Sequence, residues 1–322
     1  MNNFLIDNIS KDSNNSIKLL STIHNSWRQR SMVGKETPDY LNYNVDKPDF
    51  IEELLPFSEH YIFNELDCSE KSKILSCGWL VYNEKTVCIE SDIVTPSCND
   101  ILNNKIPGLS SPIIHKLVCE TLVDEAYHIL LVKNANLICQ YKRDLKNIDF
   151  GEFSLADNLK REQQKHPEQW KKRLIQLAAS IVSEIFVSDY LEQLSSNNTI
   201  QPFNQATVAA HRNDELAHSK IFTEITKQMI VKLDATQKEF LVRMLAQSVL
   251  WFANKDFDLW SRILVQLKIR KNKELINDCR EDNEVALDKI DCSDLIDLCK
   301  SVGFFDQAWA IQIFSDLNID VE

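Results

Sequence analysis

The sequence predicts an all-α protein built around four long helices. Glycine and proline, which end helices and form turns, are scarce, since the 322 residues contain five glycines and eight prolines. After Pro202 the chain contains one glycine, Gly303, and no proline. Apolar residues recur at helical spacing along most of the chain, and no segment shows the alternation typical of a strand.

The expected long helices cover residues 17–33, 69–94, 111–145, 170–194, 202–233 and 235–267, followed by shorter acidic helices. Four of them, from 69–94 to 202–233, form two consecutive pairs. Pro96 and Pro107 are expected to bracket a loop, and the polar residues 146–168 to cross over between the pairs. We interpret residues 1–322 as one domain, with a core bundle at about 69–233 and additional flanking helices.

The composition argues against several classes of protein. A net charge of −12 does not suit phosphate binding, so we expect no nucleic-acid partner. The N-terminus lacks a basic region followed by a long apolar run, and apolar stretches such as HILLV are too short to cross a bilayer. Nine cysteines without CxxC spacing indicate reduced thiols. We therefore expect a cytoplasmic protein with no membrane contact.

Two copies of the motif DExxH lie on the second and fourth central helices, at residues 124–128 and 214–218. Residues three apart lie on the same face of a helix. Glu125 and His128 therefore point in one direction, and so do Glu215 and His218. Two such helices facing each other would direct two carboxylates and two imidazoles at one point.

Each motif is preceded by a helix that carries a glutamate among apolar neighbours. Glu90 follows VCI, and Glu184 stands within IVSEIF. A charge in such surroundings is costly unless it is paired or bound to a metal. Four-helix bundles that hold two iron ions use a glutamate from each of two helices and Glu-x-x-His from each of the other two. The pattern therefore predicts a ferritin-like di-iron bundle.

Three further polar residues extend this pattern. His211 lies four residues before Glu215 on the same stripe, so it can supply a third imidazole; the alternative is a hydrogen-bonded core histidine. Asp124 and Asp214 are turned about 100° away from the neighbouring glutamates. Each is expected to accept the distal N–H of the histidine in the opposite motif, the alternative being a salt bridge.

The expected ligands favour iron, with manganese as a possible substitute, because carboxylates and imidazoles suit these ions and no cysteine belongs to the set. The predicted ligands are Glu90, Glu125, His128, Glu184, His211, Glu215 and His218. No catalytic residue beyond them and no substrate-binding residue is identified. The following are interpreted as structural or exposed: His24, His60, His115, Glu120, Tyr127, His166 and Arg212. Four aromatic residues are interpreted as core residues, the alternative being that they line an apolar cavity: Trp79, Phe186, Trp251 and Phe252.

The order E-x33-DExxH and E-x29-DExxH, with a histidine three residues before the second aspartate, resembles the p-aminobenzoate N-oxygenase (AurF-like) family of di-iron oxygenases. The resemblance spans residues 90–218, and His211 is its most specific part. The stretches SWRQR and PDFIEELLPF are also compatible with the family. Glu125 and Glu215 are the expected bridges between two iron ions.

The resemblance implies an oxidoreductase that uses O2 and an external electron donor to oxidise an amine nitrogen. The resemblance does not decide whether the product is a hydroxylamine, a nitroso or a nitro compound. It also does not decide whether the amine is a free small molecule or is carried on a protein. Such enzymes mostly serve natural-product biosynthesis, and family members are often homodimers. Two alternatives stay open on the same ligands: a carbon hydroxylase or desaturase, and a di-metal protein that handles iron or peroxide without acting as an oxygenase.

Overall fold

The computed structural model describes residues 15–35, 38–39, 42–145, 148–282, 285–287 and 290–321. The regular elements in these ranges are helices, and an isolated bridge joins Asn254 to Val285. The all-α prediction is confirmed. Residues 1–14, which make up nearly all of the stretch that argued against a signal peptide, lie outside the described ranges.

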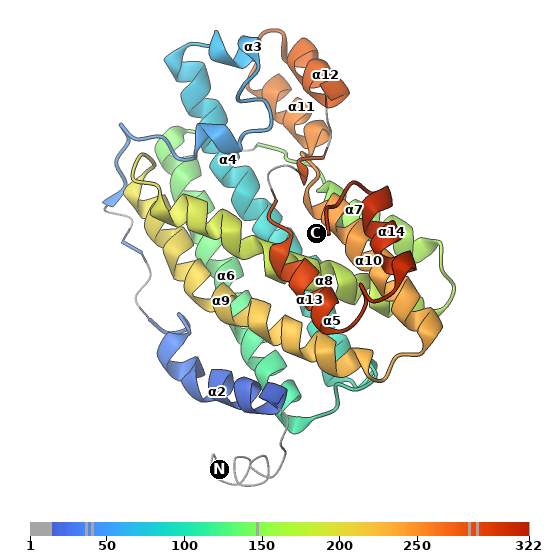
Figure 1. Ribbon diagram of the computed structural model, residues 1–322. Helices are drawn as coiled ribbons and strands as arrows, with labels where there is room; N and C mark the ends of the chain where they lie inside the picture. Colours follow the sequence, from blue (N-terminus) through green and yellow to red (C-terminus); the bar gives the residue numbers. More distant parts are fainter. Residues whose placement is uncertain are drawn as a thin grey trace.

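Four long helices form the centre of the molecule (Figure 1): α4 (Cys68–Cys88), α6 (Pro112–Arg143), α8 (Gln169–Ser196) and α9 (Pro202–Ile230). Helix α6 packs on α4 and α9, and α8 packs on α9 and α10. The remaining elements are α2 (Asn15–Arg30), η2 (Glu52–Leu54), α3 (Tyr61–Asn64), η3 (Ile89–Val94), α5 (Thr95–Leu102), α7 (Ser154–Gln164), α10 (Ala235–Phe252), α11 (Phe257–Gln266), α12 (Asn272–Asp282), α13 (Ser293–Ser301) and α14 (Ala308–Asp316).

The flanking helices cover different parts of this centre (Figure 1). Helix α2 packs against α6 and α9 at one end, while α3, α11 and α12 lie together at the other end. Helices α7, α10 and α14 lie along the side formed by α8. The additional flanking helices predicted from the sequence are therefore present.

Three boundaries were predicted wrongly. The helix does not stop at Pro96, because α5 continues directly from η3 and carries this proline in its first turn. The polar stretch 146–168 is not all crossover, since it contains α7. The segment 235–267 is two helices, which separate before Asp256, a residue in the left-handed conformation with φ of 52°. The Asp256 carboxylate binds Lys85 at 3.1 Å and stabilises this corner.

The buried apolar side chains form two clusters along the bundle. One contains residues of α5, the first half of α8, the second half of α9, and α10. The other contains residues of α4, the second half of α6, the first turns of α9, and α11. The polar residues of the two DExxH motifs are buried between them, at 124–128 and 214–218. Such a polar layer inside an apolar bundle is costly unless its groups are satisfied.

Helix α8 is long and apolar enough, by length and composition, to cross a membrane. However, 82% of its most apolar window is buried inside the protein, against α9 and α10 among other helices. This is the environment of a central helix in a packed bundle.

Candidate metal centre

Glu90 lies in a π-helical segment, Ile89–Val94, that joins α4 to α5 without a break. Because Pro96 has no N–H, the carbonyl of Asp92 four residues earlier lacks its usual helical donor. The side chain of Gln176 on α8 donates to this carbonyl at 3.0 Å. π-helical turns recur at functional sites. This one places the Glu90 carboxylate in the polar layer, where it is 3% exposed.

The structure brings all seven predicted ligands together, and none is more than 3% exposed. Their nitrogen and oxygen atoms form two groups that could each hold a metal ion, with the atoms of each group lying within 4.8 Å of one another. The first group contains Glu90, His128, His211 and Glu215, and the second contains Glu125, Glu184 and His218. Helices α6, α8 and α9 and the π-helical segment η3 therefore converge on two adjacent sites.

His211 belongs to the first group and shares its carboxylates with His128. The His211 Nε2 atom lies 2.9 Å from Glu215 Oε1 and 3.2 Å from Glu90 Oε1. The His128 Nδ1 atom lies 3.2 Å from the same Glu215 oxygen, and the two imidazole centroids are 4.1 Å apart. The His211 side chain therefore points into the centre, as its helical phase predicts.

Two carboxylates span both groups. The Oε1 atom of Glu215 faces the first group, and its Oε2 atom lies 3.5 Å from Nδ1 of His218 in the second. The Oε2 atom of Glu125 lies 3.4 Å from His128 Nδ1, while its Oε1 atom lies 3.1 Å from His218 Nδ1. Each of these glutamates can therefore contact both ions of a pair, whereas Glu184 lies near His218 at 3.9 Å.

The donor atoms fit a pair of cations. Among the described residues, both oxygens of Glu90, one oxygen each of Glu125 and Glu184, and Nδ1 of His218 are buried without a hydrogen-bond partner. Leaving such groups unsatisfied is costly. Metal ions would satisfy them, and a set of carboxylates and imidazoles suits iron or manganese.

The histidines and glutamates of the centre shift one another's pKa. Burial alone would lower the pKa of His218, but Glu215 and Glu125 outweigh it and hold this pKa well above its usual value. The pKa of His128 is likewise held well above its usual value, because the hydrogen bonds that the imidazole donates to Asp214 and Glu125 outweigh burial. Without metal, His128 and His218 therefore hold protons that a metal ion must displace.

Burial also raises the pKa of Glu184 well above its usual value, and the neighbouring Glu215 and Glu125 carboxylates add to the effect. Burial acts on Glu215 in the same direction, but the three histidines outweigh it and hold its pKa well below the usual value. Glu184 therefore joins the groups that lose a proton when the site is filled.

Asp124 and Asp214 contact the histidines of the opposite motifs. The Nε2 atom of His218 lies 3.2 Å from Asp124 Oδ2, and that of His128 lies 3.3 Å from Asp214 Oδ2. Both aspartates are fully buried. Each fixes the orientation of an imidazole across the α6–α9 interface and leaves its Nδ1 atom directed at the glutamates.

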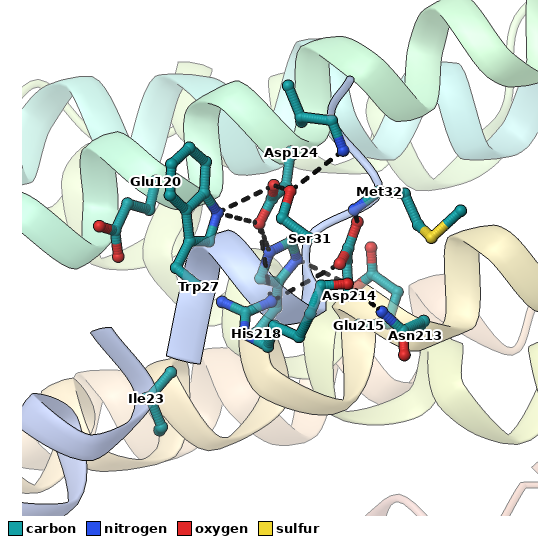
Figure 2. A network of polar contacts seen from close by, with 12 residues as sticks. Ile23, Trp27, Ser31, Met32, Glu120, Asp124, Asn213, Asp214, Glu215 and His218 are labelled. Atoms are coloured by element: carbon teal, nitrogen blue, oxygen red, sulfur yellow. Dashed lines mark hydrogen bonds and ion pairs between the residues drawn. The ribbon is translucent and has the colours of Figure 1, made fainter. Parts of the chain in front are cut away.

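Helix α2 and the two residues that follow it supply contacts to these aspartates that the sequence did not identify (Figure 2). The indole N–H of Trp27 donates to both oxygens of Asp124 at 3.0 and 3.1 Å, and the Ser31 hydroxyl donates to the same carboxylate at 2.6 Å. The backbone N–H of Met32 donates to Asp214 at 3.1 Å. The stretch SWRQR was noted only for its similarity to the family, and residues so distant in sequence gave no signal of this contact.

A small cavity adjoins both groups of ligands. Besides five of the ligands, it is lined by Thr86, Ile89, Ser183 and Val187. The Ser183 hydroxyl is buried without a hydrogen-bond partner among the described residues. These side chains, which sequence reasoning did not single out, are the nearest described candidates for contact with a substrate.

The other histidines lie outside the two groups. His24 contacts Glu120 at 2.7 Å, and His60 contacts Asp278 at 3.2 Å. Glu120 is 8% exposed, and burial raises its pKa to about 7. Its interpretation as structural thus agrees with the structure, although it is not solvated. Arg212 forms an ion pair with Glu192 at 3.1 Å, away from the centre.

Comparison with known proteins agrees with this arrangement. Residues 13–303 match the family described as p-aminobenzoate N-oxygenase AurF. The chain is also similar to a 4-aminobenzoate N-oxygenase of Streptomyces thioluteus, with 27% identity over 271 residues, which is 81% of this chain and 79% of the relative. The buried groups of glutamates and histidines lie within the matched region. The chain therefore belongs to the p-aminobenzoate N-oxygenase AurF family and is an oxidoreductase.

Proposed function

We propose that this protein is a di-iron oxygenase that uses O2 to oxidise the amino nitrogen of a small aromatic amine, with an aminobenzoate as the first candidate. The observation that carries the proposal is the third imidazole, His211, which lies beside His128 and the same glutamates. A bundle with the basic set of six ligands gives no reason for this histidine. Membership of the N-oxygenase family and the name of the relative support an aminobenzoate-type substrate.

The ligands have distinct roles in this proposal. Glu90, His128 and His211 hold one ion, Glu184 and His218 hold the other, and Glu125 and Glu215 contact both. Iron ions bound there would supply the redox chemistry that activates O2, so that one oxygen atom could be transferred to the substrate nitrogen while electrons from the external donor and two protons convert the other to water. Asp124 and Asp214 keep the two imidazoles oriented, and the surrounding apolar clusters exclude water. Manganese is expected to bind the same donors.

The cavity beside the centre has room for about one water molecule, and we place the amine nitrogen, not the whole substrate, at its edge. Ile89 and Val187 give it apolar walls, and the hydroxyl of Ser183 is available to a polar group of the substrate. An external donor must return electrons to the ions after each turnover. The proposed setting is natural-product biosynthesis, with hydroxylamine, nitroso or nitro compounds as successive products.

The test is an oxygen-transfer assay with an isotope label. The protein is loaded anaerobically with Fe(II), reduced, and exposed to labelled O2 with aminobenzoates, other free amines and amines attached to a carrier protein. We expect mass spectrometry to show label on the amine nitrogen, and benzoate lacking the amino group serves as the control. Label on carbon alone would reject N-oxygenation and indicate a hydroxylase on the same scaffold.

A further inference from the structure

Ser183 brings an unpartnered hydroxyl to the cavity beside the metal centre. It lies on α8 directly before the ligand Glu184, and it is 1% exposed. A buried serine in a helix commonly donates to the carbonyl four residues earlier, as Ser180 on the same helix does to Gln176 at 3.0 Å. The Ser183 hydroxyl has no hydrogen-bond partner among the described residues, and its residue lines the cavity. This hydroxyl is therefore available to a molecule that enters the cavity.

The cavity is too small for the ring of an aromatic amine. Its volume is about 10 Å³, which is room for about one water molecule. Glu90 and His211 from the first group of ligands line it, and so do Glu125 and Glu184 from the second. A small ligand in this cavity would therefore lie beside both groups at once.

The chemistry of the walls selects the kind of ligand. A serine hydroxyl has one hydrogen to donate, and its oxygen can accept a further hydrogen bond. A buried donor that is left without an acceptor is costly, so a ligand that accepts a hydrogen bond is favoured at this position. Dioxygen and hydroxide are acceptors of suitable size, and they are ligands that a pair of iron ions binds.

We propose that Ser183 is a binding residue for a small hydrogen-bond acceptor, of the class of dioxygen or hydroxide, that occupies the cavity beside the metal pair. The hydroxyl donates its hydrogen to this ligand. Its oxygen can at the same time accept an N–H from the amine nitrogen at the edge of the cavity, so one side chain holds both reactants next to each other. The inference rests on the proposed metal centre and names a residue outside its ligand set.

Fluoride is a suitable probe, because it is a single atom that accepts hydrogen bonds and binds iron(III). S183A removes the donor and makes the cavity larger, so weaker binding in this variant cannot be caused by crowding. Alanine is also the residue that helices favour most. S188A is the matched control, because Ser188 lies on the same helix and its hydroxyl donates to the carbonyl of Ile185 at 3.4 Å, outside the cavity lining.

Each protein is loaded with iron, oxidised to the iron(III) form, and titrated with fluoride at one pH while its ultraviolet absorption is followed. We expect the fluoride affinity of S183A to be at least about 10-fold lower, the effect of losing one hydrogen bond to a charged acceptor. S188A should match the unchanged protein. Equal affinities for S183A and S188A would overturn the inference, and so would the absence of fluoride binding in the unchanged iron-loaded protein.

Iron content and circular dichroism separate a role in ligand binding from a structural one. S183A should hold as much iron as the unchanged protein and show the same helical spectrum. Loss of iron or of helix in S183A overturns the inference, because the hydroxyl would then support the centre or the fold. Failure of the unchanged protein to bind iron is a different result, since it overturns the proposed metal centre itself.

Discussion

Replacing Asp124 with asparagine tests how much the orientation of His218 contributes to metal binding. The carboxylate accepts hydrogen bonds from Trp27, Ser31 and His218, so donors face both of its oxygens. The substituted amide has one acceptor, and its best arrangement keeps that oxygen toward His218 while the Ser31 hydroxyl rotates. The bond to His218 then changes from a charge-assisted bond of about 1.5–3 kcal/mol to a neutral one of about 0.5–1.5 kcal/mol.

The hydrogen bond to His218 is therefore weakened by about 1–1.5 kcal/mol, which corresponds to a loss of roughly 10-fold in affinity for the metal ion. We expect D124N to show this loss in an Mn(II) titration, with a far-UV spectrum that matches the unchanged protein. The control is D157N, which removes a carboxylate that pairs with Arg161 at the surface of α7. Equal Mn(II) affinities for D124N and D157N would refute the role assigned to Asp124.

Two further predictions concern the histidines. H211A should lower O2-dependent amine oxidation by at least 10-fold, the usual lower limit for loss of a group near a metal centre, while circular dichroism shows intact helices; unchanged turnover would make His211 an ordinary core histidine. Metal affinity should rise with pH, because the pKa values of His128, His218 and Glu184 are raised in the metal-free site and binding must displace their protons. Titrations between pH 6 and 8 should show an affinity that rises with pH, and a flat profile would contradict the raised pKa values of these groups.

The sequence predicted which side chains lie together at the candidate centre, because the relevant geometry is local to single helices. The i, i+3 and i, i+4 spacings decide which side chains share a face, so the common face of His211, Glu215 and His218 on α9 followed from their spacing alone. The crossed contacts of Asp124 and Asp214 followed from the same phase and from two equivalent motifs that face each other across a helix interface. Burial of Glu90 and Glu184 followed from their apolar neighbours.

The features that were missed depend on contacts between distant segments. Pro96 indicated a loop, but Gln176 from α8 satisfies the carbonyl that the proline leaves free, so the helix continues. Arg30 follows from no helical spacing rule, because it contacts aspartates on two other helices, Asp124 on α6 and Asp214 on α9. A sequence pattern specifies the face of a helix, whereas its partner is set by the packing of the whole bundle.

The central claim is that seven side chains, from α6, α8, α9 and the π-helical segment η3, form one site for two metal ions. Its most direct test is the number of iron atoms bound per chain after anaerobic loading with Fe(II) and removal of the excess. The account predicts two irons per chain, with loss of both or of one in variants that replace Glu125 or Glu215, which contact both groups. One iron or none in the unchanged protein would contradict it.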